Sequence, residues 1–204
     1  MNLHPYHLPP PRLLAGKRIG ILGGTFDPCH KGHRHLAMWA LKKAAVDAVW
    51  LLVSPQNPLK KNANSSPLPQ RLASCTPIIN GHPRLHAAAY EQALHTRFTR
   101  DTLTALRRRY PTTDFVLLLG ADCWRDFSRW KQWKALIKNN IAVFSREWYS
   151  VGVGGFIATR FAVAHRRWSP RGSFPGLSSV TFFSIPWNPL SSTTLRMRFS
   201  CPIF

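Results

Sequence analysis

Residues 17–33 read KRIGILGGTFDPCHKGH, and this stretch decides the fold. Its first part, residues 18–22, is short, apolar and followed by glycine, which predicts a buried β-strand that ends at Gly23. From residue 31 to residue 45 the apolar positions recur at the spacing of a helix that packs one face onto a sheet. These positions are Leu36, Ala37, Ala40, Leu41 and Ala44. Gly23 and Gly24 therefore lie where a strand turns into a helix.

This turn carries the residue types of a phosphate-binding site. Glycine lets the backbone approach a ligand closely, and the free N–H groups at a helix N-terminus attract an anion. His30 and His33 are three residues apart, so both imidazoles project from one face of the first helical turn and can donate to one phosphate group. A histidine at a helix start can be only a cap, but two histidines around Gly32, beside a double glycine, favour phosphate binding. No G-x-x-x-x-G-K-[ST] sequence occurs, which argues against a P-loop enzyme.

The rest of the chain alternates strand-like and helix-like segments. Strands are predicted at 18–22, 48–53, 84–88, 114–119, 141–145 and 180–185, and helices at 31–45, 69–80, 99–109, 124–138 and 192–199. This alternation predicts an α/β fold, a single Rossmann-like domain with a mostly parallel twisted sheet and helices on both faces. Ligands bind such sheets outside the carboxyl ends of the strands. Gly23, Ser54 and Gly120 each follow a predicted strand, so the three turns can line one crevice.

The chain of 204 residues is long enough to bury a core as one domain. Residues 1–16 hold four prolines and no apolar stretch of signal-peptide length, so we expect a disordered extension before a domain of residues 17–204. A misassigned start codon explains that extension equally well. No apolar run reaches the roughly 18–20 residues that span a bilayer, so no membrane partner is expected. The four cysteines show no metal-ligand or C-x-x-C spacing, which predicts reduced thiols, a cytoplasmic location and no metal-ligating residues.

The strong positive charge of the chain needs an explanation. Its 28 lysines and arginines against 8 acidic residues give a net charge of +20. A positive field speeds the encounter with polyanionic nucleotides, but this excess exceeds what one site can use, so most of it is expected on the solvated surface. Nucleic-acid binding is the competing explanation. The cations are dispersed and no helix-turn-helix, zinc-finger or RNP-type sequence occurs, so we expect at most non-specific binding of nucleic acid.

Four ordered motifs carry a resemblance to a known family. Residues 23–33 resemble the GG-T/S-F-D-P-x-H-x-G-H signature of the adenylyltransferases in the nucleotidyltransferase superfamily, most closely that of the bacterial nicotinate-nucleotide adenylyltransferases. Residues 54–60 resemble the family's loop with a proline pair and a lysine. Residues 120–133 resemble its G-A-D-x-x-x-x-F-x-x-W-x-x-W block, and residues 190–196 its I-S-S-T-x-I-R motif.

The resemblance implies an enzyme that joins ATP and nicotinate mononucleotide to give nicotinate adenine dinucleotide and pyrophosphate, in NAD biosynthesis. Such a transfer joins two anions, so the protein's task is mainly positioning and charge neutralisation, with Mg²⁺ arriving with ATP. In either protonation state an imidazole can donate at least one hydrogen bond, so His30 and His33 fit as donors to the triphosphate. Together with Arg196 they are the expected catalytic residues.

The expected ATP site draws on distant parts of the chain. Ser192 and Thr193 would present free N–H groups at a helix start, and the guanidinium fork of Arg196 suits phosphate, although a plain capped helix explains the same run. Asp122 follows a predicted strand, where a carboxylate could hold ribose hydroxyls or hydrated Mg²⁺. Asp27 is expected to close its own turn. The full ATP-binding set is Gly23, Gly24, Thr25, Phe26, His30, Gly32, His33, Asp122, Arg146, Ser192, Thr193 and Arg196.

For the acceptor, the resemblance implies three residues. Trp130 would stack on the pyridine ring, since a flat indole offers contact area at low entropic cost. The backbone N–H of Thr99 would help to recognise the nicotinate carboxylate, and Lys60 would face the phosphate of the mononucleotide. The tryptophan has a second explanation, because residues 124–138 can form an amphipathic helix whose aromatic side chains belong to the core.

Two alternatives to this function stay open. Within the same reaction class, the acceptor could be nicotinamide mononucleotide or another phosphorylated compound such as phosphopantetheine. Outside enzymes, a nucleotide-binding or nucleic-acid-binding protein could keep the fold without catalysis. The sequence leaves the oligomeric state undetermined.

Overall fold

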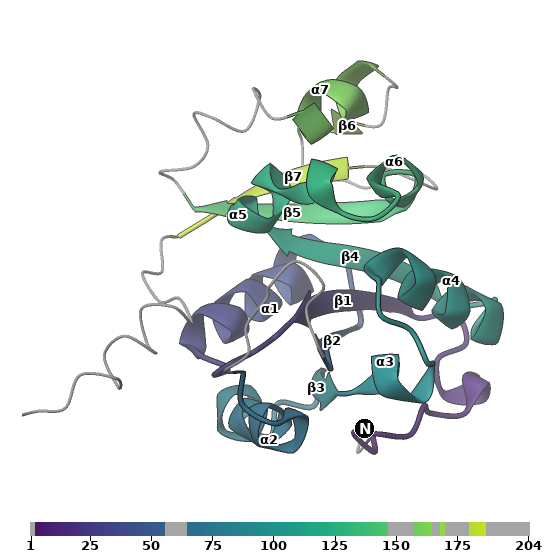
Figure 1. Ribbon diagram of the computed structural model, residues 1–204, viewed down its shortest axis with the longest axis vertical. Coiled ribbons are helices and arrows are strands. Elements are labelled where there is room, and N and C mark those ends of the chain that lie inside the picture. Colours follow the sequence, from purple (N-terminus) through teal and green to yellow (C-terminus); the bar gives the residue numbers. More distant parts are fainter. Residues whose placement is uncertain (1–2, 56–64, 147–156, 165–167, 170–179, 187–204) are drawn as a thin grey trace, which may run out of the picture.

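The computed structural model describes residues 3–55, 65–146, 157–164, 168–169 and 180–186. Within them the strands form one seven-stranded sheet of order β3-β2-β1-β4-β5-β7-β6, and every adjacent pair is parallel. Figure 1 shows the strands stacked from β7 near the top to β3 near the bottom. The strands are β1 Arg18–Gly24, β2 Ala48–Val53, β3 Leu85–Ala88, β4 Asp114–Gly120, β5 Asn140–Arg146, β6 Trp168–Ser169 and β7 Val180–Ile185. The predicted α/β class and its six strands are confirmed, and the short β6 is an addition.

The connections between the strands are helical, as parallel pairing requires. The helices are α1 Lys31–Lys43, α2 Leu68–Ile79, α3 Tyr90–Ala93, α4 Thr99–Arg109, α5 Ala121–Arg125, α6 Trp133–Leu136 and α7 Ile157–Ala164, with 3₁₀ turns η1 Pro11–Leu13 and η2 Phe127–Arg129. The helices predicted at 31–45, 69–80 and 99–109 are confirmed as α1, α2 and α4. The one predicted at 192–199 lies outside the described residues.

The prediction of one helix over residues 124–138 is wrong. The segment is divided into α5, η2 and α6 because Trp130 is extended, with ψ 146°, and Gln132 is left-handed, with φ 53°. Trp124 and Phe127 are fully buried and their rings stack with centroids 4.9 Å apart. We attribute the break to this tertiary packing, which overrides the helical spacing of the apolar side chains.

The sheet is covered on both faces, which explains the continuous apolar runs of its strands. On one face Ile19 and Ile21 pack in a core with α4 and the aromatic residues of α5 and η2. On the other face Leu22 packs in a second core with Ala37 and Ala40 of α1, and α2 completes this layer. Adjacent β1 residues reach opposite faces because side chains alternate along a strand.

The structure differs from the expectation of disorder at the N-terminus. Residues 3–16 lie along the domain, and Leu14 is 1% exposed within the core beside α4. The Tyr110 hydroxyl donates to the carbonyl of Pro9 at 2.8 Å, and the backbone N–H of Ala89 donates to Pro5 at 2.8 Å. These buried contacts make the segment part of the packed structure over the described range.

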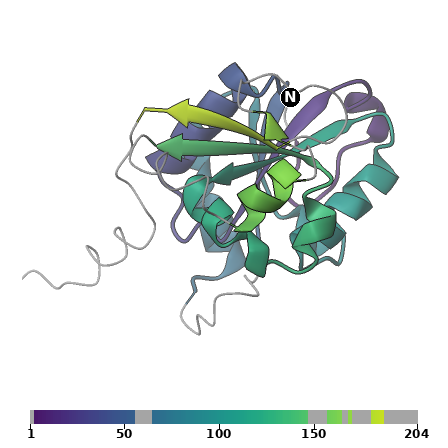
Figure 2. The same ribbon diagram turned by 90° about the horizontal axis from the view of Figure 1, so that it is seen from above.

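The topology defines the edge at which a ligand can bind. β1 lies between β2 and β4 in the sheet. After β1 the chain adds β2 and β3 on one side of β1, and then β4 and the later strands on its other side. Seen from above, the arrowheads of β4, β5 and β7 point the same way (Figure 2). In open α/β sheets ligands bind outside the carboxyl ends of the strands at such a switch point. The corner after β1 and the turn after β4 both lie at this edge.

Candidate active site

The phosphate-binding corner is held by reciprocal hydrogen bonds between its two histidines and the backbone. His30 is the N-cap of α1, and its Nδ1 accepts from the backbone N–H of Gly32 at 3.1 Å. The Nδ1 of His33 accepts from the backbone N–H of His30 at 3.2 Å. This is the geometry of a capping box, with imidazoles in the place of the usual serine and glutamate.

These bonds turn the Nδ1 atom of each ring toward the helix backbone. The ring centroids of His30 and His33 are 3.7 Å apart, and the ring of Phe26 packs edge-on against His33 at 4.7 Å. A neutral imidazole that accepts at Nδ1 carries its proton on Nε2. The cap therefore selects, for both histidines, the tautomer that can donate from the ring edge opposite the helix backbone.

The backbone before the histidines is open at Gly23 and strained at Phe26. A Cβ on Gly23 would meet no atom within 4 Å, and a Cβ on Gly24 would press on the Phe26 ring at 3.2 Å. Phe26 has φ 49°, a conformation that non-glycine residues seldom adopt and that marks functional sites. The hydroxyl oxygen of Thr25 is buried and has no hydrogen-bond partner among the described residues.

Asp27 does more than close its own turn. The side chain is 6% exposed, and its Oδ2 accepts from the backbone N–H of Ser66 at 3.2 Å. The carboxylate thus joins the corner to the start of α2, 39 residues later in the chain. We expected only a local bond, because a contact between distant segments has no signature in the spacing of this residue.

The turn after β4 brings Asp122 to the same edge. Gly120 ends β4, and Asp122 is exposed in the first turn of α5. A Cβ on Gly120 would overlap Oδ1 of Asp122, so glycine leaves room for the carboxylate to lie over this turn. Arg146 is the last residue of β5, whose carboxyl end lies at the same edge, and its side chain is outside the described residues.

Two of the expected acceptor residues, Thr99 and Trp130, lie on segments that contact each other on the α4 side of the sheet. Thr99 is the first residue of α4, so its N–H is one of those that a helix leaves without an internal partner. Trp130 is partly buried, with its ring 5.3 Å from that of Phe127. The ammonium of Lys131 lies 4.1 Å from the Phe98 ring and 3.7 Å from Asp101. These contacts join the loop that carries Trp130 to the start of α4.

The remaining predicted residues are not described by the structure. Lys60, Ser192, Thr193 and Arg196 all lie outside the described residues. The structure therefore places the corner, Asp122 and the start of α4 with Thr99 at the carboxyl edge of the sheet, and leaves these others as predictions. Among the described residues no group of three or more His, Cys, Asp or Glu side chains is placed to hold a metal ion.

Cys29, inside the corner, is a packed residue. It is 6% exposed and lies in the core with Cys75. A hydrogen bond with Cys75, together with burial, raises the pKa of the Cys29 thiol well above its ordinary value. A thiol in this state is a poor nucleophile, so Cys29 is a small packing residue of the corner.

Arg71 is a residue that we did not predict. It lies on α2 and is 3% exposed, although it carries a formal charge. Its guanidinium donates to the backbone carbonyls of Thr25 at 2.8 Å, Ser54 at 2.7 Å, Pro55 at 2.9 Å and Ser66 at 2.8 Å. A signal was present in the sequence, because Arg71 occupies the same helical face as Leu68, Leu72 and Cys75.

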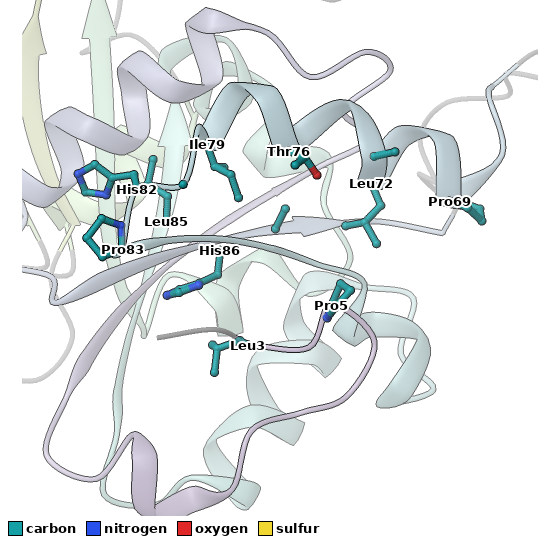
Figure 3. Close-up of a pocket in the computed structure, with 13 residues that line it drawn as sticks. Leu3, Pro5, Pro69, Leu72, Thr76, Ile79, His82, Pro83, Leu85 and His86 are labelled. Carbon is teal, nitrogen blue, oxygen red and sulfur yellow. The ribbon is translucent and has the colours of Figure 1, made fainter.

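The structure also contains a cavity away from this edge. It has a volume of about 670 Å³ and lies between the N-terminal segment, α2 and β3 (Figure 3). Leu3 and Pro5 line one side, and His82 and His86 line it near β3. Burial lowers the pKa of His82, and it lowers that of His86 to about 4, so both rings are neutral near pH 7. None of the predicted site residues that the structure describes lines this cavity.

Several of the cations lie at the end of the sheet opposite the corner. Arg107, Arg108 and Arg109 form the last turn of α4, and Lys42 and Lys43 that of α1. Both helices start at the carboxyl end of the sheet and run back along it. Cations in a last turn interact favourably with the helix dipole. These cations therefore lie where they stabilise their own helices.

The chain is similar to proteins of one family. A family model described as cytidylyltransferase-like matches residues 21–198. A protein of Cereibacter sphaeroides named "probable nicotinate-nucleotide adenylyltransferase" is 38% identical over 188 residues, which cover 87% of this chain and 95% of the relative. A protein of Gluconacetobacter diazotrophicus with the same name is 40% identical over 186 residues, which cover 88% of this chain and 85% of the relative.

A solved structure supports the fold. The Plasmodium falciparum nicotinic acid mononucleotide adenylyltransferase complexed with NaAD matches with a TM-score of 0.65 at 20% sequence identity. The match covers 89% of this chain and 83% of the other. No helix in the described part of the chain is long and apolar enough to cross a membrane.

Proposed function

The chain belongs to the cytidylyltransferase-like family and, within it, to the nicotinate-nucleotide adenylyltransferases, and from this membership we propose which of its residues carry out the reaction. The enzyme is a nucleotidyltransferase of NAD biosynthesis that joins ATP and nicotinate mononucleotide and releases pyrophosphate. The reaction takes place at the carboxyl edge of the sheet, between the corner after β1 and the turn after β4.

The geometry of the two histidines carries this proposal. Both Nδ1 atoms accept backbone hydrogen bonds, so both Nε2–H groups can donate to the triphosphate of ATP. The rings, 3.7 Å apart, form a fixed pair of donors that need not reorganise when charge develops on the phosphate oxygens. The space that a Cβ of Gly23 would occupy is open, so the nucleotide can approach the backbone there.

The acceptor approaches from the α4 side. Its phosphate oxygen attacks the α-phosphorus of ATP while the bond to pyrophosphate breaks, a displacement that needs positioning and charge neutralisation but no protein nucleophile. The indole of Trp130 stacks on the pyridine ring, and the N–H of Thr99 at the start of α4 binds the nicotinate carboxylate. Lys60 binds the acceptor phosphate, and Arg146, Ser192, Thr193 and Arg196 complete the ATP site.

Mg²⁺ fits this edge when it enters with ATP. The ion binds mainly phosphate oxygens and water and needs few protein ligands. The exposed carboxylate of Asp122, held over Gly120, is the residue that would hold it through water. Bound there, Mg²⁺ would neutralise charge on the leaving pyrophosphate.

The test is pyrophosphate release by the purified protein with Mg-ATP, comparing nicotinate mononucleotide with nicotinamide mononucleotide at equal concentrations. We expect strong preference for the acid, because a helix N-terminus favours an anion over an amide. Preference for the amide would contradict the role of Thr99. No release with either compound would contradict the proposed function itself.

A further inference from the structure

Arg71 makes an unusual set of contacts for a charged residue. Its side chain is 3% exposed, and it uses four of its five N–H donors on backbone carbonyls. The acceptors come from three separate segments of the chain: the corner after β1, the loop after β2 and the residues before α2. One guanidinium therefore joins these three segments on the α1 side of the carboxyl edge.

The bond to Thr25 has a specific consequence for the corner. Within a planar trans peptide the carbonyl and the following N–H point in opposite directions. By fixing the Thr25 carbonyl, Arg71 also fixes the direction of the Phe26 N–H. Phe26 has φ 49°, and a strained residue persists only where its surroundings hold it.

The charge of Arg71 is also unusual. Burial lowers the pKa of its guanidinium, and the nearby carboxylate of Asp27 opposes that effect. Asp27 itself accepts from the N–H of Ser66, whose carbonyl Arg71 also binds. Burying a charge is a costly way to gain stability, since apolar side chains of equal size can do as well. What a guanidinium adds is a rigid planar fork that fixes several acceptors at once.

We propose that Arg71 is a positioning residue for adenylyl transfer, which fixes the Thr25–Phe26 peptide of the phosphate-binding corner relative to Ser54 and Pro55 after β2. It touches neither substrate and acts through the backbone that it holds. This inference rests on the proposed function, because it assumes that the corner binds the triphosphate.

The experiment compares Arg71→Lys with Arg84→Lys in the full-length chain. Arg84 is the matched control because it donates to two backbone carbonyls, those of Asp47 and Val46, both at 2.6 Å, before β2 rather than after it. For each variant kcat, both KM values and the thermal midpoint are measured, with kinetics at a temperature where the protein is folded. We expect kcat/KM to fall at least tenfold for Arg71→Lys and to change less than twofold for Arg84→Lys.

The outcomes separate positioning from stability. If Arg71→Lys loses thermal stability but keeps kcat and both KM values within twofold, the proposal is wrong. Arg71→Gln, which retains two N–H donors, takes the place of the lysine variant if that variant does not fold. Failure of both to give folded protein would also overturn the proposal in favour of a purely structural role. An inactive wild-type protein, by contrast, would contradict the proposed function itself.

Discussion

The two ends of the sheet use polar groups in opposite ways. At the amino end, Arg18 donates to Asp114 at 2.7 Å, and its backbone N–H donates to Asp47 at 2.7 Å. At the carboxyl end, the imidazoles of His30 and His33 accept from the backbone and so direct their N–H donors elsewhere. Polar groups at the amino end satisfy one another, whereas under the proposed function the imidazoles at the carboxyl end donate to a ligand.

This difference separates stability from function along one set of strands. A substitution at the amino end should change the free energy of unfolding and leave turnover unchanged. A substitution of a proposed site residue at the carboxyl end should change turnover or KM with a small effect on stability. Arg71 combines both uses. Its guanidinium is satisfied by protein groups, as the polar groups of the amino end are, but the backbone that it holds belongs to the carboxyl end.

The largest effect is expected for His33→Ala. Loss of one fixed donor to the triphosphate should lower kcat about a hundredfold, equivalent to about 2.7 kcal/mol in the activation barrier. The same change removes the acceptor for the His30 N–H, which should cost only about 1 kcal/mol of stability. Steady-state pyrophosphate release and thermal unfolding measure the two effects.

Two further variants show whether the loss comes from the donor or from the helix cap. Glutamine is the usual partner in a capping box, so His33→Gln should restore the stability and leave kcat low. His35→Ala changes a histidine two residues away, whose Nε2 contacts the carbonyl of Pro186 at 2.9 Å, and should leave kcat unchanged. If His33→Gln recovered full turnover, the imidazole would have no part in the reaction.

At the opposite end of the strands, Leu14→Ala should affect stability alone. Leu14 is 1% exposed just before β1, and its carbonyl accepts from the Thr113 hydroxyl at 2.8 Å. Removing a fully buried leucine side chain leaves a cavity and should lower the free energy of unfolding by about 3 kcal/mol. Chemical denaturation measures it. A loss of turnover in folded Leu14→Ala protein would contradict the idea that the amino end serves stability and the carboxyl end serves turnover.

The fold was predictable because its signals are local and repeated. The six longer strands and helices α1, α2 and α4 each carry a clear apolar pattern with a boundary residue. The prediction of one helix over residues 124–138 was wrong because Trp124 and Phe127 are placed by packing between segments rather than by helical spacing. The prediction of disorder for the N-terminal segment was wrong because the segment is held by single contacts, such as that of Tyr110 with Pro9. Such contacts have no recurring pattern in the sequence.

The candidate site was predictable only in part. His30 and His33 were predicted as phosphate donors from their spacing, which stays a prediction, and the structure adds the reciprocal cap that sets their tautomer. Trp130 and Thr99 came from the resemblance, since a backbone N–H leaves no signature in the sequence. Arg71 was missed because its partners are carbonyls, which every residue possesses, so that only its place on an apolar helix face distinguishes it.

A smaller effect is expected on the acceptor side. Trp130→Ala should raise the KM for nicotinate mononucleotide about tenfold and change the KM for ATP little, because stacking acts on the pyridine ring alone. Trp39→Ala is the control, since Trp39 lies on α1 with the ammonium groups of Lys42 and Lys43 each 5.2 Å from its ring. Equal changes in both KM values would show that Trp130 only supports the core.

The smallest effect concerns Glu91, a buried carboxyl group after β3. Its Oε1 accepts from the Thr102 hydroxyl at 3.2 Å, and its Oε2 has no hydrogen-bond partner among the described residues. Burial raises the pKa of this carboxyl group, so the folded state holds its proton more tightly than the unfolded state. The stability it contributes is present below the unfolded pKa and is lost as the pH rises through the folded pKa.

Glu91→Gln should therefore stabilise the protein increasingly as the pH rises from 4 to 8, by about 1 kcal/mol at the upper limit. Asp114→Asn, which breaks the pair with Arg18 at the amino end, should have the opposite sign and lower stability at neutral pH. Denaturation curves at several pH values compare the two. If Glu91→Gln destabilised the protein at pH 8, the ionised carboxylate would have a partner there, and the carboxyl end would be satisfied in the same way as the amino end.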